Sequence, residues 1–309
     1  MSRLRTVFMG SPEFAVPTLR AVMATTDLCA VVTQPDKPAG RGQKLLPPAV
    51  KAVAGEAGIP VLQPRSARAP EFLDSLKALQ PDVAVVVAYG KILPQAVLDV
   101  PMHGCLNVHA SLLPRYRGAA PIQWAIIRGE KETGVTIMRL DAGMDTGPML
   151  ISRVVPIADE DTAGTLSERL AKAGAELMVV ALERLQVGGL VETPQDHAGA
   201  TLAPLLSKEH GRIDWTKPAV ELWNLVRGVD PWPGAYTLLG DELLKAWGAK
   251  VVKGSGEPGT VIDVDRDGLV VACGEGALAL AELQLPGRKR MPARALVAGR
   301  PIPPGTRLG

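Results

Sequence analysis

Short apolar runs alternate with segments of helical periodicity along the first two-thirds of the chain. Runs of this length predict buried strands, and the intervening residues 16–24 and 47–57 carry apolar residues at helical spacing. The strands are expected at residues 5–9, 29–33, 61–63, 83–88, 104–109, 135–139 and 149–157. Because parallel strands need a crossover segment between them, this order predicts an open, mostly parallel (Rossmann-like) α/β sheet with helices on both faces.

A longer helix is expected after these strands, because apolar residues recur at steps of three and four. They are Leu166, Leu170, Ala173, Leu177 and Ala181. Thr165 and Glu168 have the spacing of a capping box at the start of this helix, and Gly188 with Gly189 marks its end. Residues 191–218 mix Pro, Gly, Thr, His and charged residues without a strong period, as a connector does.

The last third changes to short β-like runs separated by turn signals. The runs are residues 235–239, 243–252, 260–264, 269–273 and 277–285. Five short strands in this order favour a small barrel of the oligonucleotide-binding (OB) type. The sequence therefore predicts a catalytic domain over residues 1–190, a linker over 191–207 and an OB-like domain over 208–309.

The composition is that of a globular protein of two domains, with 309 residues, 47% of them hydrophobic and 21% charged. The first residues have neither the apolar run of a signal peptide nor that of a membrane span, and the three cysteines are far apart. We therefore expect a cytoplasmic protein with reduced thiols and no membrane partner. The net charge of +2 hides two basic stretches without acids, residues 37–55 and 283–309. These stretches are either solvated surfaces or contacts for a long anionic partner.

Candidate chemistry begins at the strand expected over residues 104–109. Asn107 and His109 are two residues apart and project on the same face of a strand, whereas Val108 faces the other way. An amide donor beside an imidazole suits transfer of an acyl group between nitrogens, because the reaction creates an oxyanion and moves protons. The alternative is a structural role, in which Asn107 caps a turn and His109 is a satisfied core histidine.

Two loops favour the chemical interpretation. The segment SLLPRYRGAAPI follows the strand and opens a helix, at the strand end where open α/β sheets hold ligands. The segment LDAGMDTG supplies two carboxylates, Asp141 and Asp145, and glycines that allow close approach of a ligand. Either carboxylate can orient the imidazole and assist removal of a proton from an amine.

A metal site is not expected. His103, Cys105, Asn107 and His109 alternate, but four such residues on a strand span about 20 Å, which is too far to surround one ion.

Four segments together closely resemble the methionyl-tRNA formyltransferase family, and the resemblance covers almost the entire chain. They are NVHASLLPRYRGAAPIQWAI, GVTIMRLDAGMDTG, VTQPDKPAGRGQK and FMGSPEFAVPTL. The resemblance implies Asn107, His109 and Asp145 as the catalytic residues and 10-formyltetrahydrofolate as the formyl donor. It also implies that the donor lies against strand-end segments and is held largely by backbone groups. The donor-binding residues are then Val87, Ala88, Tyr89, Gly90, Ile92, Leu93, Ser111, Leu112, Leu113, Pro114, Asp141, Gly143 and Met144.

The same resemblance gives the basic stretches a partner, initiator methionyl-tRNA. Arg41, with Lys37 and Lys44 as phosphate contacts, lies in a segment that resembles the family's insertion loop. Arg288, Lys289 and Arg290 resemble the family's second tRNA-binding surface. We expect a monomer.

Three alternatives are weighed against this interpretation. A sibling formyltransferase acting on an amino sugar nucleotide or glycinamide ribonucleotide shares the Asn-His-Asp residues, but the basic stretches argue against it. A nicotinamide-dependent oxidoreductase fits the sheet, yet the first strand-to-helix turn reads GSPEF and not G-x-G-x-x-G. A non-enzymatic RNA-binding module leaves NVH and LDAGMDTG unexplained.

Overall fold

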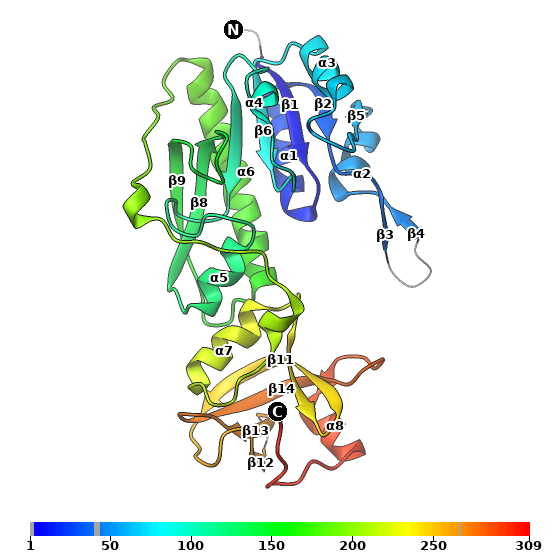
Figure 1. Cartoon of the computed structure of the whole chain (residues 1–309), viewed down its shortest axis with the longest axis vertical. Coiled ribbons are helices and arrows are strands. Elements are labelled where there is room, and N and C mark those ends of the chain that lie inside the picture. The colour runs from blue at the N-terminus through cyan, green and yellow to red at the C-terminus, as the bar shows by residue number, and fades with distance from the viewer. Residues whose placement is uncertain (1–2, 40–43, 266) are drawn as a thin grey trace. The chain divides into compact units, whose positions relative to one another are not determined.

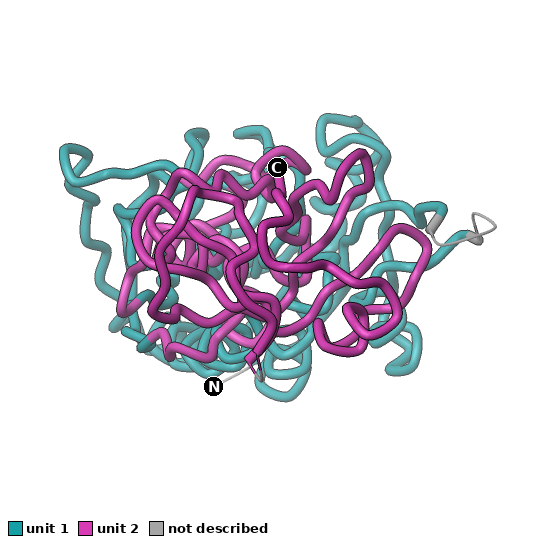
Figure 2. Tube along the Cα trace, turned by 90° about the horizontal axis from the view of Figure 1, so that it is seen from below, with its two compact units in different colours: residues 1–118, 133–156, 167–202 teal, residues 119–132, 157–166, 203–309 magenta. Residues whose placement is uncertain are grey.

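The structure is a computed structural model that describes residues 3–39, 44–265 and 267–309. The chain divides into two compact units (Figure 2). Unit 1 contains residues 1–118, 133–156 and 167–202, and unit 2 contains residues 119–132, 157–166 and 203–309.

Unit 1 is built on a seven-stranded sheet with the order β5-β2-β1-β6-β7-β8-β9 (Figure 1). The strands are β1 Arg5–Gly10, β2 Asp27–Val32, β5 Val61–Leu62, β6 Val83–Val87, β7 Cys105–His109, β8 Glu132–Arg139 and β9 Met149–Pro156. The pairs β5/β2, β2/β1, β1/β6 and β6/β7 are parallel, and β7/β8 is antiparallel. The mostly parallel sheet expected from the sequence is therefore confirmed, together with all seven of its strands.

The helices associated with this sheet are α1 Val16–Thr25, α2 Ala49–Glu56, α3 Pro70–Ala78, α4 Gln95–Leu98 and most of α6 Ala163–Gln186, with 3-10 turns η1 Glu13–Ala15 and η2 His197–Gly199. The helical segments 16–24 and 47–57 are confirmed as α1 and α2. A small antiparallel hairpin, β3 Lys37–Ala39 and β4 Lys44–Leu46, was not expected from the sequence. Its strands are too short to show a period.

The expected cap of α6 is wrong by one turn. The helix begins at Ala163, so Thr162 is the capping residue and Thr165 is the third helical residue. The backbone N–H of Thr165 donates to Oγ1 of Thr162 (3.2 Å), and the backbone N–H of Thr162 donates to Oγ1 of Thr165 (2.9 Å). A threonine thus replaces the expected Glu168 in the reciprocal bond. Gly188 ends the helix as expected, with a φ of 71°.

The order of the strands reverses between β1 and β6, which are both central. Gly10 at the end of β1 pairs with Val87 at the end of β6. A Cβ at Gly10 would lie 2.8 Å from the carbonyl oxygen of Val87, so only glycine fits there. Ligands bind in open α/β sheets beyond the carboxyl ends of the strands at such a reversal.

Unit 2 is an antiparallel sheet with the order β10-β11-β14-β13-β12, to which β15 adds beside β14. Its strands are β10 Ala235–Leu239, β11 Glu242–Val252, β12 Val261–Val264, β13 Leu269–Ala272, β14 Ala277–Gln284 and β15 Met291–Pro292, and its helical elements are α5 Pro121–Ile127, η3 Lys208–Gly211, α7 Ala219–Gly228 and α8 Ala293–Gly299. The five predicted strands are confirmed. The spacing G-x-G-x-x-G occurs at residues 254–259, between β11 and β12, where a strand and not a helix follows.

The C-terminal tail joins the two edge strands of this sheet. Leu308 forms a bridge with Leu239 of β10, and Arg307 forms one with Thr260 next to β12. The antiparallel β domain expected after the parallel sheet is therefore confirmed, while its OB topology stays a prediction. Within the described ranges, no helix has the length and apolar character needed to cross a membrane.

Candidate active site

Strand β7 carries two of the predicted site residues on one face. Asn107 and His109 are 9% and 5% exposed, and they follow Cys105, which lies in the apolar cluster of that face. Val108 points to the other face, where a Cβ at Gly174 of α6 would lie 2.6 Å from its Cγ1. Strand alternation therefore places the amide and the imidazole on the same face, as expected.

The imidazole of His109 has one partner at each nitrogen. Nε2 lies 3.0 Å from the carbonyl oxygen of Tyr116, and Nδ1 lies 3.6 Å from Oδ1 of Asp145. A carbonyl oxygen only accepts, so Nε2 carries the hydrogen. Nδ1 is therefore the nitrogen that remains for exchange of a proton.

The loop after β8 decides between the two candidate carboxylates. Asp145 has a φ of 54°, a conformation that Asp tolerates better than most residues, and its Oδ2 accepts the backbone N–H of Gly118 at 2.8 Å. Asp141 instead stabilises its own loop, since its Oδ1 accepts the N–H of Gly143 (3.0 Å) and the hydroxyl of Thr146 (2.7 Å). Asp145 is thus the carboxylate that faces His109.

The amide of Asn107 makes no hydrogen bond with any residue that the structure describes. A nearly buried amide without a partner is costly unless water or a ligand satisfies it. This side chain is therefore available as a hydrogen-bond donor in the middle of β7.

The loop that follows β7 is fixed from within. The hydroxyl of Ser111 donates to the carbonyl of Arg115 (2.6 Å), and the hydroxyl of Thr136 donates to the carbonyl of Ser111 (2.7 Å). Ser111 is fully buried, so its contribution is to the shape of the loop.

Two further residues at this site, Arg117 and Gln195, were not found by sequence reasoning. Gln195 is 6% exposed, and its Nε2 donates to the carbonyls of Asp145 (2.9 Å) and Gly147 (2.7 Å). Its Oε1 accepts Nε (3.1 Å) and Nη2 (2.7 Å) of Arg117. Residues 195–201, which resemble a connector in sequence, thus form part of the site. The only feature of the sequence that could have pointed to either residue is the position of Arg117 within the loop segment SLLPRYRGAAPI.

The residues predicted to bind the formyl donor fall into three groups by exposure. Exposed residues are Ala88, Gly90, Ile92, Asp141, Gly143 and Met144; partly buried residues are Leu112 and Pro114; buried residues are Val87, Tyr89, Leu93, Ser111 and Leu113. Ala88 has a φ of 45°, which is rare for a residue with a Cβ and often accompanies functional sites. The buried members can offer only backbone groups to a ligand.

The side chain of Tyr89 turns into the core of unit 1. It is 2% exposed, its burial raises the pKa of its phenol to about 12, and its carbonyl accepts Nε2 of Gln34 at 2.9 Å. Gln34 follows β2, so this bond links the carboxyl ends of two parallel strands.

The basic residues differ in their surroundings. Lys37 is exposed at the start of the hairpin, whereas Arg41 lies outside the described residues and Lys44 is placed only as the first residue of β4. In unit 2, Arg288 and Lys289 are exposed. Arg290 is paired with Glu282 and with Asp230 (3.3 Å), and its guanidinium lies over the ring of Trp247.

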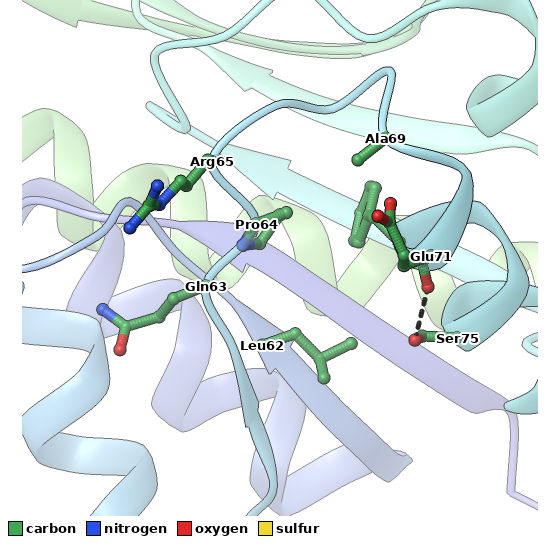
Figure 3. Close-up of a pocket in the computed structure, with 8 residues that line it drawn as sticks. Leu62, Gln63, Pro64, Arg65, Ala69, Glu71 and Ser75 are labelled. Carbon is green, nitrogen blue, oxygen red and sulfur yellow. Dashed lines mark hydrogen bonds between the residues drawn. The ribbon is translucent and has the colours of Figure 1, made fainter.

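A pocket of about 350 Å³ lies at the end of β5. Its lining residues are drawn in Figure 3. It is lined by Leu62, Gln63, Pro64, Arg65, Ala69, Glu71, Phe72 and Ser75. None of the predicted site residues is among these described lining residues. Within the described part of the chain, no three His, Cys, Asp or Glu side chains come together as metal ligands.

Comparison with known proteins identifies two matching family models. Residues 5–182 match the formyl transferase family, and residues 205–301 match the formyl transferase C-terminal domain. The methionyl-tRNA formyltransferase of Geobacter sulfurreducens is 53% identical over 310 residues, which cover 100% of this chain and 98% of that protein.

Solved structures share the fold at low identity. HypX from Aquifex aeolicus, in complex with tetrahydrofolic acid, has a TM-score of 0.64 and 19% identity, covering 96% of this chain and 47% of that one. An N-formyltransferase from Helicobacter canadensis, with folinic acid and dTDP-3-aminofucose, has a TM-score of 0.68 and 18% identity, covering 89% of this chain and 98% of that one. Together with the family models and the identity over the full length, these findings lead to one conclusion: the chain belongs to the formyl transferase family and, within it, to the methionyl-tRNA formyltransferases.

Proposed function

We propose that this protein transfers the formyl group of 10-formyltetrahydrofolate to the α-amino group of initiator methionyl-tRNA, with Asn107, His109 and Asp145 as the catalytic residues. The observation that carries the catalytic assignment is the 3.6 Å approach of His109 Nδ1 to Asp145 Oδ1, beside an amide that has no partner among the described residues. The identity with methionyl-tRNA formyltransferases over the full chain supports the choice of substrates.

His109 and Asp145 act together on the amine proton. Nε2 of His109 is occupied by the carbonyl of Tyr116, and Oδ2 of Asp145 is occupied by the N–H of Gly118. The two remaining acceptors, Nδ1 and Oδ1, therefore face each other and share the position of one proton. A proton that the attacking amine releases is received at this position.

Asn107 acts on the carbonyl oxygen of the formyl group. Its amide donates to the oxyanion that forms when the amine attacks, and this interaction strengthens as negative charge develops. The Asn107 amide is in place before the reaction, because the residues on either side of it belong to strand β7, which fixes their backbone.

The reaction balances without a covalent enzyme intermediate. The neutral amine attacks the formyl carbon, a C–N bond forms, and the π electrons of the carbonyl move to its oxygen. The His109–Asp145 pair takes the proton from the new C–N nitrogen, and the N10 nitrogen of the donor gains a proton as its bond to carbon breaks. The products are N-formylmethionyl-tRNA and tetrahydrofolate.

The formyl donor is proposed to lie against two strand-end segments, residues 85–94 and 141–147. The first begins within β6 and continues past its end at the reversal of strand order, where Ala88 and Gly90 both have positive φ values, 45° and 77°. Such a backbone leaves N–H and carbonyl groups directed at a ligand, so we propose that the thirteen donor-binding residues predicted from the sequence contact the donor mainly through the main chain.

Initiator methionyl-tRNA is proposed to contact Lys37, Arg41 and Lys44 with the end of its acceptor stem. It is also proposed to contact unit 2 at Arg288, Lys289 and Arg290. We also propose domain limits of 1–190 and 208–309 with a linker between them, a monomeric state, and action in the cytoplasm. Phosphate contacts of this kind add affinity with little sequence preference.

The second candidate is transfer to an amino sugar nucleotide, because the Helicobacter canadensis neighbour was solved with dTDP-3-aminofucose. The test is incubation of the protein with 10-formyltetrahydrofolate labelled in the formyl carbon and equal concentrations of charged initiator tRNA and an amino sugar nucleotide. We expect label in the tRNA only. Label in the sugar nucleotide, or in neither acceptor, would refute the proposed function.

A further inference from the structure

Gln195 lies at the centre of a closed set of hydrogen bonds around Asp145. Its Nε2 donates hydrogen bonds to the carbonyls of Asp145 (2.9 Å) and Gly147 (2.7 Å), and its Oε1 accepts two hydrogen bonds from the guanidinium of Arg117. The residue after Arg117 is Gly118, whose N–H holds Oδ2 of Asp145 at 2.8 Å. Both the main chain and the carboxylate of Asp145 are therefore held, and the residues that hold them are joined to each other.

The conformation of Asp145 explains why it needs this support. Its φ of 54° is unfavourable for a residue with a Cβ and persists only when the surroundings enforce it. Gln195 uses both hydrogens of its amide to fix the carbonyls on either side of Thr146. The carboxylate is thereby fixed relative to His109.

Arg117 has an unusual environment for a cation. It is 7% exposed, and within the described ranges no carboxylate lies within ion-pair distance of its guanidinium. Its side-chain partners are the neutral Oε1 of Gln195 and Nδ1 of His197 (3.2 Å). A buried charge is costly to keep, so its retention favours a role beyond packing.

The segment that carries Gln195 also fixes the partner of His109. The hydroxyl of Thr201 accepts the N–H of Tyr116 (2.9 Å), and the carbonyl of Thr201 accepts the N–H of Arg117 (2.8 Å). Tyr116 in turn provides the carbonyl that binds Nε2 of His109. Residues 195–201 thus support both members of the pair that exchanges the proton.

We propose that Gln195 and Arg117 are positioning residues that hold Asp145 in its catalytic geometry. The inference rests on the proposed function of Asp145. It predicts a loss in kcat with little change in KM for either substrate, because neither side chain needs to touch the substrates. A misplaced catalytic group of this kind costs about tenfold to a hundredfold in rate.

Two variants of Gln195 separate positioning from stability. Gln195→Met keeps the size of the side chain but removes all of its hydrogen bonds. Gln195→Glu keeps an acceptor for Arg117 and gives that cation an anionic partner, but it places a carboxylate against the carbonyls of Asp145 and Gly147. We expect both variants to lose kcat by about tenfold or more, while Gln195→Glu has the higher Tm of the two. Wild-type kcat in a stable Gln195→Glu protein would overturn the inference.

The second test combines Gln195→Met with Asp145→Ala. If Gln195 acts through Asp145, its replacement has no further effect on kcat once the carboxylate is removed. A loss in the Asp145→Ala background equal to that in the wild-type background would overturn the inference. Wild-type activity of Asp145→Ala itself would instead refute the proposed function.

A matched control lies in unit 2. Arg227 is also buried, and its Nε (3.1 Å) and Nη2 (2.8 Å) also converge on one amide oxygen, that of Asn224. Asn224→Ala removes a similar pair without touching the residues proposed for catalysis. We expect this variant to lower Tm and to leave kcat unchanged. An equal loss of kcat in Asn224→Ala and Gln195→Met would show a general effect of stability and overturn the inference.

Discussion

The Nε2 atom of His109 donates to the carbonyl oxygen of Tyr116 at 3.0 Å, and Tyr116 holds this carbonyl in place with a φ of 62°. The main chain therefore selects the tautomer of the imidazole and leaves Nδ1 as the exchanging atom. A side chain that reproduces the bond at Nε2 but has no base at Nδ1 tests this relationship.

His109→Gln is such a change, since the glutamine amide can donate to Tyr116 but cannot take a proton. We expect kcat to fall by about a hundredfold or more, with Tm close to that of the wild type. Single-turnover rates and thermal unfolding measure the two quantities. Activity within a few-fold of the wild type would contradict the role of Nδ1.

Asn107→Ala removes the proposed donor to the oxyanion. We expect a loss in kcat of about a hundredfold to a thousandfold, because such a donor acts mainly in the transition state. KM for the folate and for the tRNA should change little. Steady-state kinetics with each substrate varied in turn measures this, and a rise in KM at constant kcat would assign Asn107 to ground-state binding instead.

Gly10 tests the close approach of β1 and β6 at the reversal of strand order. Gly10→Ala places a Cβ 2.8 Å from the carbonyl oxygen of Val87, so we expect the free energy of unfolding to fall by about 1–3 kcal/mol. Gly55→Ala is the control, because nothing lies within 4 Å of its Cβ in helix α2. That change should stabilise the protein by about 0.5–1 kcal/mol. Urea unfolding of both variants checks the opposite signs.

The basic residues of unit 2 are expected to differ in their effect on tRNA binding. All three residues are exposed, but Arg290 forms ion pairs with Glu282 and Asp230. Replacing Arg288 or Lys289 by Ala should lower the slope of log Kd against log salt by about one. Arg290→Ala should instead lower Tm with a smaller change in slope. Equal slopes in all three variants and the wild type would argue against this surface as a tRNA contact.

Asp36 gives a prediction about pH. A hydrogen bond from Gln63 and the ammonium of Lys51 lower the pKa of this carboxyl below its ordinary value of 3.8. A lowered pKa in the folded state means that the stabilisation is present above pH 3.8 and is lost as the pH falls through the folded value. The stability difference between the wild type and Asp36→Asn should therefore be constant near neutral pH and disappear in acid. Urea unfolding of both proteins at a series of pH values measures this difference. A stability difference that persists at acidic pH would contradict the pairing of Asp36 with Gln63 and Lys51.

Much of the framework follows from local pattern. Buried parallel strands require continuous apolar runs, so the seven strands of unit 1 were found from the sequence. Asn107 and His109 share a face because alternation in a strand is fixed by its backbone geometry. The hairpin of β3 and β4 was missed and the cap of α6 was misplaced. Strands of three residues and single capping residues are too short to leave a periodic pattern in the sequence.

The sequence by itself determined the seven strands of the unit 1 sheet, that an amide and an imidazole project together from β7, and which family the motifs resemble. The tertiary structure decided that Asp145 and not Asp141 faces His109, that Gln195 from an apparent connector holds it, and that Arg290 is ion-paired. The reason is the range of the interactions. Periodicity is set by neighbours along the chain, whereas the bond from Gln195 to Asp145 joins residues 50 apart in sequence, which only the folded chain brings together.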